Sequence, residues 1–186
     1  MQIDHVKKLK EDIINKIINI EGGYVNDKND SGGETTFGVT KNTARRYGYK
    51  GRMIDLSRDI AFEIYESMYL KPIMFEQIAR QSLSIAEELA DTAVNMGVSR
   101  SGKMLQRSLN ALNNGGKYYN DIKTDGVIGE ATLRALVSYL SKRGKVGEVV
   151  LLRALNGLQV SFYINLVERR RKDERFLFGW LKNRVV

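Results

Sequence analysis

Apolar residues near the N-terminus recur every three or four positions, which is the period of an amphipathic α-helix. The stripe consists of Val6, Leu9, Ile13, Ile17 and Ile20, with Ile14 and Ile18 beside it. Asp4 is placed to cap the start of this helix, and Gly22 and Gly23 are placed to end it. Glu21 therefore falls in the last helical turn.

Glu21 has the surroundings that a general acid needs. The negative end of the helix dipole disfavours an ionised carboxylate, and so does any apolar wall beside it. Both effects raise the pKa of Glu21, which is the direction required of a general acid near neutral pH. The alternative is a solvated glutamate at a helix end, so the residues that follow decide between the two.

A turn-rich loop and a short strand follow the two glycines. Asn, Asp, Ser and Gly dominate residues 26–33, and Thr35 to Val39 predicts a short β-strand. Asp30 is the carboxylate nearest this hairpin. A second carboxylate near an acid of raised pKa is the minimum equipment for glycoside hydrolysis, and the hydroxyls of Thr35 and Thr36 could hold water. The alternative role of Asp30 is to bind backbone amides in the turn.

The rest of the chain predicts helices joined by short turns. Thr40 is placed to cap a helix over 41–47 that stops at Gly48, and Ser57 to cap a helix that runs to about Leu70. Further helices are predicted over 84–96, from Ser99 or Ser101 onward, from the segment 124–133 to about Leu140, and from Val146 to about Asp173. The fold class predicted is mainly α, a helical bundle with one small β-hairpin after the first helix.

Five residues are candidates for binding a substrate in a cleft beside this hairpin. They are Tyr24, Phe37, Tyr65, Tyr69 and Asn95. Core packing is the alternative for the tyrosines, and satisfying a helix end is the alternative for Asn95.

Composition limits both the fold and the chemistry. With 186 residues and 42% apolar content, the chain suits one compact unit, which we divide into a catalytic region over 1–90 and a helical region over 91–186. There is no cysteine and a single histidine, His5. The chain therefore lacks the residues that zinc amidases and cysteine peptidases need. A glycosidase that uses carboxylates needs neither cysteine nor histidine. No cofactor and no metal are expected.

The net charge of +8 predicts a polyanionic partner, and bacterial cell wall, nucleic acid and anionic membrane all qualify. The basic run 169–172 lies beside acidic residues in a helical segment, which favours a solvated helix face. Because no zinc-finger spacing and no aromatic RNA-binding motif is present, we do not expect nucleic-acid binding.

The N-terminus does not read as a secretion signal, because Lys7, Lys8 and Lys10 interrupt its apolar residues. No uninterrupted apolar run approaches the ~18 to 20 residues of a membrane span, so stable membrane insertion is not expected. We expect a monomer made in the cytoplasm. To act on the cell wall, in the periplasm or outside the cell, it would need a holin or another export helper.

Several motifs together resemble glycoside hydrolase family 108, the phage and prophage N-acetylmuramidase endolysins of the lysozyme-like superfamily. The densest is Glu21-Gly22-Gly23-Tyr24, then Asp30-Ser31-Gly32-Gly33 and Thr35-Thr36-Phe37-Gly38-Val39-Thr40, with further matches at 91–97, 106–107, 124–133 and 176–185. Glu21, Asp30 and Thr36 have the spacing of the glutamate, aspartate and threonine in phage lysozymes. The family usually has a proline where this chain has Lys28, and its threonine often aligns better with Thr35.

The resemblance implies a lysozyme-like α+β fold and hydrolysis of the β-1,4 bond between N-acetylmuramic acid and N-acetylglucosamine in peptidoglycan glycan strands. It implies that Glu21 is the general acid, that Asp30 is the base or electrostatic partner, and that Thr36 or Thr35 holds water. It also implies a peptidoglycan-binding C-terminal region, for which the alternative is a purely structural one. A lytic transglycosylase and a non-catalytic wall-binding or secretion-accessory protein are the alternative functions.

Overall fold

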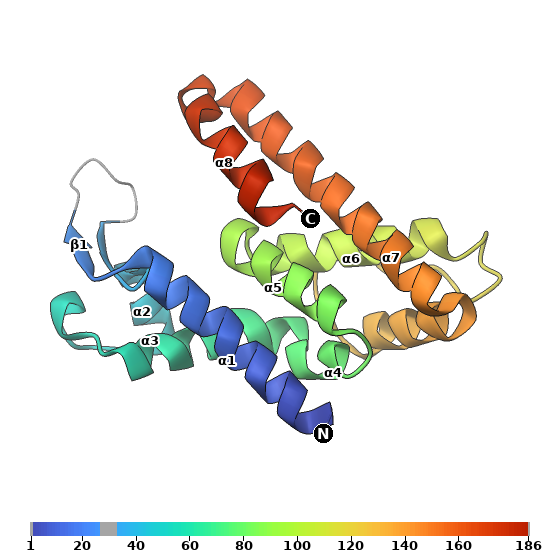
Figure 1. The fold of residues 1–186 in the computed structure, drawn as a ribbon, viewed down its shortest axis with the longest axis horizontal. Helices are drawn as coiled ribbons and strands as arrows, with labels where there is room; N and C mark the ends of the chain where they lie inside the picture. The colour runs from blue at the N-terminus through green and yellow to red at the C-terminus, as the bar shows by residue number, and fades with distance from the viewer. Residues whose placement is uncertain (1, 27–32, 186) are drawn as a thin grey trace.

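The computed structural model of the chain describes residues 2–26 and 33–185 and is mainly α-helical, with one small sheet (Figure 1). The helices are α1 (Gln2–Glu21), α2 (Lys41–Tyr47), α3 (Arg58–Tyr65), α4 (Phe75–Ala79), α5 (Leu83–Met96), α6 (Val98–Leu112), α7 (Glu130–Arg169) and α8 (Glu174–Arg184). Single turns of 3-10 helix lie at Met53–Asp55, Lys71–Ile73 and Arg171–Asp173, and a π-helical turn lies at Glu66–Leu70. The predicted fold class is confirmed.

Helix α1 buries one side and ends where the glycine pair predicted. Ile14 and Ile18 are almost fully buried, on a side that packs against α3 and α5. Gly22 follows the helix with a φ of +71°, a left-handed conformation that suits glycine and stops the helix. The prediction that Asp4 caps the start was wrong, because α1 already includes Gln2 and Asp4 lies within its first turn.

The segment predicted as one strand over 35–39 forms two strands and a tight turn. Strands β1 (Tyr24–Asn26), β2 (Glu34–Thr36) and β3 (Val39–Thr40) make a three-stranded antiparallel sheet in that order. Phe37 and Gly38 connect β2 to β3 with φ values of 52° and 74°. Two successive positive φ angles are typical of a type I′ hairpin turn, which matches the twist of the flanking strands.

Helix α5 is the central helix of the fold. It contacts α1, α4, α6 and α7, and Ala86, Ala90 and Ala93 are completely buried. Their small side chains let the neighbouring helices approach closely. Ser82 caps α5, with its hydroxyl accepting a hydrogen bond from the N–H of Ile85, and Gly97 follows its last residue.

Helix α6 begins at Val98, directly after Gly97 and one residue before Ser99, the earlier of the two starts predicted. Ser101 is buried and donates a hydrogen bond to the carbonyl oxygen of Leu89 at 2.8 Å. Its hydroxyl therefore joins α6 to α5 and does not cap α6.

Helix α7 combines the two helices predicted over the second half of the chain. Gly144 kinks it, with φ and ψ values of 57° and −149°, so the two predicted segments are separated at this residue. The second segment ends at Arg169, four residues earlier than predicted. The chain then reverses into α8, and the two helices form a projecting hairpin (Figure 1).

By length and composition alone, α7 could cross a membrane. It spans 40 residues, and one stretch within it has a mean hydropathy of 1.3. Core helices of soluble proteins meet the same criteria, so this is weak evidence for a membrane span. In this structure α7 packs against α5, α6 and α8.

Aromatic stacking holds α8 against α7. The ring of Trp180 stacks on that of Tyr163 at 5.1 Å and on that of Phe176 at 5.9 Å. Tyr163 is buried, so the tryptophan is fixed to the core of the C-terminal region. Trp180 thus anchors α8 to α7.

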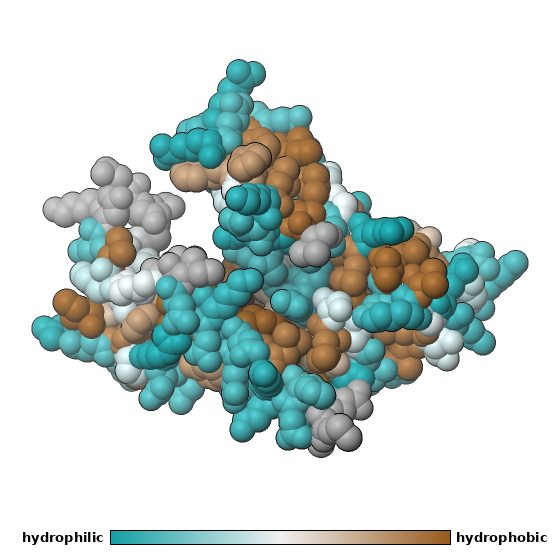
Figure 2. Space-filling model, in the orientation of Figure 1, coloured by the Kyte–Doolittle hydropathy of each residue, from teal (hydrophilic) through white to brown (hydrophobic). Residues whose placement is uncertain are grey.

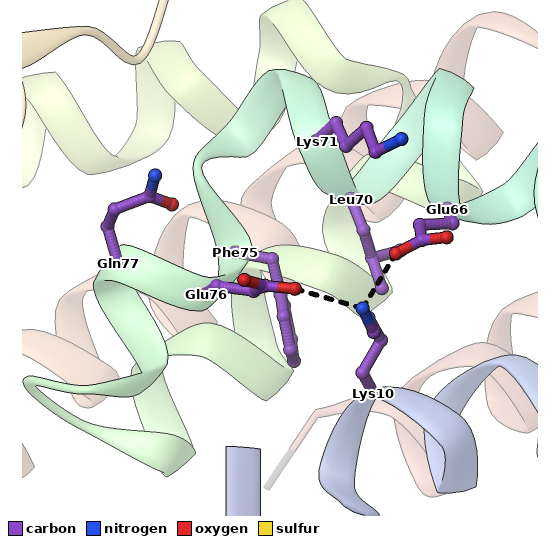
Figure 3. Close-up of a pocket in the computed structure, with 7 residues that line it drawn as sticks. All are labelled: Lys10, Glu66, Leu70, Lys71, Phe75, Glu76 and Gln77. Atoms are coloured by element: carbon purple, nitrogen blue, oxygen red, sulfur yellow. Dashed lines mark hydrogen bonds and ion pairs between the residues drawn. The ribbon is translucent and has the colours of Figure 1, made fainter. Parts of the chain in front are cut away.

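A small open pocket of about 160 Å³ beside α1 is lined by ion-paired residues (Figure 3). The ammonium group of Lys10 lies 2.6 Å from Glu66 and 2.9 Å from Glu76. These bonds tie α1 to two later segments of the catalytic region. Since Lys10 lies about three turns before Glu21 along α1, we assign this pocket a structural role.

Replacing Lys10 with methionine should lower the free energy of unfolding at pH 7 by about 1 kcal/mol, because it leaves two neighbouring carboxylates without their cation. The hydrogen bond from Lys10 lowers the pKa of Glu76. The Lys10–Glu76 pair therefore contributes to the free energy of unfolding at pH values above the ordinary glutamate pKa. This contribution is lost as the pH falls through the lowered pKa of Glu76 in the folded protein. Urea unfolding at pH 7 and pH 3 measures this, with Lys7→Met as a control whose side chain is 74% exposed. An equal loss for Lys10→Met at both pH values would contradict the assignment.

Candidate active site

Glu21 occupies the last position of α1, at the break that Gly22 produces. The structure describes the backbone of Glu21, but the direction of its side chain lies outside what it describes. Asp30, the predicted second carboxylate, also lies outside the described residues. The site is therefore built here from the elements that surround the end of α1.

Two hydrogen bonds fix the backbone beside Glu21. The N–H of Phe37 donates to the carbonyl oxygen of Gly22 at 3.1 Å, and the hydroxyl of Tyr65 donates to the carbonyl oxygen of Phe37 at 3.1 Å. The first joins the end of α1 to the β2–β3 turn, and the second joins that turn to α3. Phe37 has a positive φ, which is uncommon for a residue other than glycine and persists only where the surroundings enforce it.

The two candidate water-holding threonines have different surroundings. Thr36 is 3% exposed, and its hydroxyl donates to the carbonyl oxygen of Met53 at 2.7 Å. A buried hydroxyl engaged in this way does not fit a role in holding water. Thr35 lies on the opposite face of β2 and is half-buried, and the one contact that its hydroxyl makes among the described residues is a long 3.4 Å contact with the Gly33 carbonyl. Thr35 is the better placed of the two.

A carboxylate that the sequence analysis did not select lies on the same sheet. Glu34 accepts a 2.6 Å bond from the ammonium group of Lys41 and a 3.0 Å bond from the hydroxyl of Tyr24. Lys41, and then Tyr24, lower the pKa of Glu34, so this carboxyl is ionised at neutral pH. The register of the two strands is the signal that identifies Glu34. Glu34 pairs with Asn26, which lies two residues after Tyr24, so Glu34 and Tyr24 share one face of the sheet.

The candidate sugar-binding rings are not equally open. Tyr65 is 3% exposed, so the substrate-binding role expected for it does not fit its burial, and it instead positions the β2–β3 turn. Tyr69 is half-buried with its ring centre 5.6 Å from that of Tyr65, and Phe37 is also half-buried. Tyr24 is the most open of the four aromatic candidates, at 37% exposure.

A cleft of about 430 Å³ lies between α1, α5 and the end of α8. On the α1 side Ile17 lines it, and Glu21 follows four residues later on the same helix, about one turn beyond Ile17. On the α5 side Asn95 lines the cleft, with its amide donating to the Asp91 carboxylate at 2.9 Å. Figure 2 shows a hollow on this face of the molecule, between the sheet and the projecting α7–α8 hairpin.

Two carboxyl groups of α5 lie near the cleft in sequence, and one of them, Asp91, lines it. The other, Glu88, is 7% exposed, and one of its oxygens has no hydrogen-bond partner among the residues that the structure describes. Burial, with a smaller contribution from nearby Asp91, raises the pKa of Glu88 to about 7. Burial also raises the pKa of Asp91, although Arg184 and a hydrogen bond from Gln159 oppose this. Sequence reasoning missed this cluster, because its members come from three helices far apart in the chain.

Replacing Glu88 with glutamine should make the stability of the fold less dependent on pH. A carboxyl with a raised pKa in the folded state destabilises that state increasingly as the pH rises from the ordinary value of 4.5 to about 7. The Glu88 carboxyl should lower the free energy of unfolding by up to about 3 kcal/mol at pH 8, and Glu88→Gln should not show this decrease.

Unfolding free energies measured from pH 4.5 to 8 check this expectation. Glu130→Gln is the matched control, because Glu130 lies at the exposed start of α7 with 71% of its side chain accessible. A Glu88→Gln profile parallel to that of the wild type would contradict the assignment.

Comparison with known families identifies both halves of the chain. Residues 14–97 match the family model described as glycosyl hydrolase 108, and residues 100–185 match that described as a predicted peptidoglycan domain. A glycoside-hydrolase region followed by a peptidoglycan region makes the chain a peptidoglycan hydrolase of the glycosidase class. By family, residues 14–97 belong to glycosyl hydrolase 108.

Among solved structures, that of Brucella abortus SagA matches with a TM-score of 0.69 and 23% sequence identity, over 95% of this chain and 89% of that one. At this identity the match shows a shared fold. No curated protein matches the chain. The cleft described above is lined from both matched regions, since α1 and α5 belong to the first and α8 to the second.

Proposed function

We propose that the protein hydrolyses the β-1,4 glycosidic bond between N-acetylmuramic acid and N-acetylglucosamine in peptidoglycan, with Glu21 as the general acid. The observation that carries this proposal is the position of Glu21. It ends α1 about one turn beyond the residues that line the open cleft, next to a backbone fixed by Phe37. A carboxyl group at a cleft can donate a proton to the oxygen of the leaving sugar.

The second requirement is a group that activates water or stabilises the positive charge that develops on the sugar ring. Asp30 is our proposal for this role, on its spacing from Glu21. Thr35 is our proposal for the residue that orients the water, because its hydroxyl is less engaged than that of Thr36. Glu34 is held ionised by Lys41, so it adds fixed negative charge to the sheet.

Charge supports a cell-wall substrate. The net charge of +8 favours association with an anionic wall, and this association should weaken with salt. We further propose that the protein acts as a monomer on the wall after leaving the cytoplasm, with a holin or a similar helper providing the route.

Replacing Glu21 with glutamine should lower the rate of hydrolysis of purified peptidoglycan at least about 100-fold, because the amide cannot donate the proton. Turbidity follows the rate, and mass spectrometry identifies the new sugar ends. The wild type should release reducing muramic acid ends. Glu11→Gln, on the same helix, is the control and should keep full activity.

Two outcomes would contradict the proposal. Wild-type rates in Glu21→Gln, with circular dichroism showing both proteins folded, would remove Glu21 from catalysis. Release of 1,6-anhydro ends by the wild type would place the protein among the lytic transglycosylases, which need only one glutamate.

A further inference from the structure

Three arginine side chains from different helices line one pocket of about 390 Å³. Arg100 comes from α6, Arg170 directly follows α7, and Arg184 ends α8. The rings of Phe162 and Trp180 line the same pocket. We call it the arginine pocket.

The positive charge of this pocket is not neutralised within the part of the chain that the structure describes. None of the three guanidinium groups forms an ion pair with a described carboxylate. Arg100 packs over the ring of Phe162 at 4.4 Å and donates to the carbonyl oxygen of Met96. Three guanidinium groups that line one pocket give it a positive potential, so the pocket is complementary to a ligand with negative groups.

Of the three arginines, Arg184 has a carboxylate nearby. It interacts electrostatically with Asp91, whose two carboxylate oxygens already accept hydrogen bonds from Asn95 and Gln159. Arg184 therefore has a nearby acidic group, whereas Arg100 and Arg170 have no ion-pair partner among the described residues.

The aromatic walls of the pocket are rigid. Trp180 is held by stacking on Tyr163, and the ring of Phe162 lies 5.8 Å from that of Tyr163. Fixed flat surfaces bind apolar and amide groups of a ligand with little loss of side-chain entropy. The pocket thus combines three fork-shaped cations with two aromatic faces.

The arginine pocket adjoins the cleft below Glu21. Asn95 and Arg184 line both spaces. A ligand that filled both would need uncharged sugar units along the cleft and an anionic branch that reached the arginines. A glycan strand with stem peptides has this chemistry, because each peptide leaves the strand at a muramic acid unit and carries free carboxylates.

We propose that the arginine pocket binds the carboxylate groups of the peptidoglycan stem peptide while the glycan strand lies in the cleft between α1, α5 and α8. The proposal rests on the substrate class of the proposed function, and it adds a site for the peptide branch. The C-terminal region would then help to select strands that carry peptides.

The single tryptophan of the chain, Trp180, lies in this pocket and reports on its occupation by fluorescence. The probes are a soluble disaccharide tetrapeptide from peptidoglycan, the same molecule with its carboxylates converted to amides, uncharged chitotetraose, and a glycerol phosphate oligomer. We expect the disaccharide tetrapeptide to change the Trp180 emission and the amidated form to bind at least about 10-fold more weakly.

Arg170→Gln should weaken binding of the disaccharide tetrapeptide about 10-fold or more, because it removes one charge-assisted contact. Arg169→Gln is the matched control, since this neighbouring arginine is exposed and does not line the pocket, and it should change binding less than about twofold. Arg100→Gln should act like Arg170→Gln. Arg100→Lys, which keeps the charge, checks that any loss is not due only to lost packing on Phe162.

Equal binding of the free and amidated probes would overturn the proposal, and so would unchanged binding in Arg170→Gln. Tighter binding of the glycerol phosphate oligomer would assign the pocket to phosphate and overturn the choice of carboxylates. Catalysis is measured separately, on purified walls with Glu21→Gln. A protein that binds the probe through Arg170 but clears no wall would contradict the proposed hydrolysis and leave the peptide site standing.

Discussion

The hydrogen bond from the Phe37 N–H to the Gly22 carbonyl is the contact on which the catalytic region depends most. Two glycines follow α1, and glycine gives a chain end little stiffness of its own. The sheet beside it has strands of only two or three residues, too short to be stable alone. The hydrogen bond from Phe37 joins the end of α1 to the sheet, so that each stabilises the other. The Tyr65 hydroxyl attaches the β2–β3 turn of this sheet to α3.

A second level of organisation comes from α5, which joins the two matched regions. Its alanines allow α1, α6 and α7 to pack closely around it. The same helix presents Asn95 to the cleft and to the arginine pocket. Because α8 returns along α7 and is held there by Trp180, Arg184 reaches α5. The C-terminal region therefore completes the cleft.

Local chemistry made much of the fold predictable. The helix stops at Gly22, Gly48 and Gly97 and the cap at Thr40 depend on nearest neighbours, and they are where the sequence placed them. The failures needed longer-range information. The burial of Ser101, for example, depends on the hydrogen bond from its hydroxyl to the Leu89 carbonyl oxygen of another helix.

The candidate site was predictable in its centre and less so in its surroundings. A helix-ending glutamate followed by glycines is a local signal. The burial of Thr36 depends on the carbonyl of Met53, and the pairing of Glu34 with Lys41 depends on how the short strands align. In the arginine pocket, Arg100 lies 70 positions before Arg170 and 84 before Arg184, so only the packing of α6, α7 and α8 brings the pocket together.

The pKa of the Glu21 carboxyl is the quantity that tests the role of this residue most directly. It can be measured by carbon NMR on protein labelled at glutamate carboxyl carbons, with Glu21→Gln used to assign the resonance. We predict a pKa above the ordinary value of about 4.3 and a fall in hydrolysis rate as the pH rises through it. A Glu21 carboxyl that titrates at or below the ordinary value, in a protein whose activity persists well above it, would contradict its role as the acid.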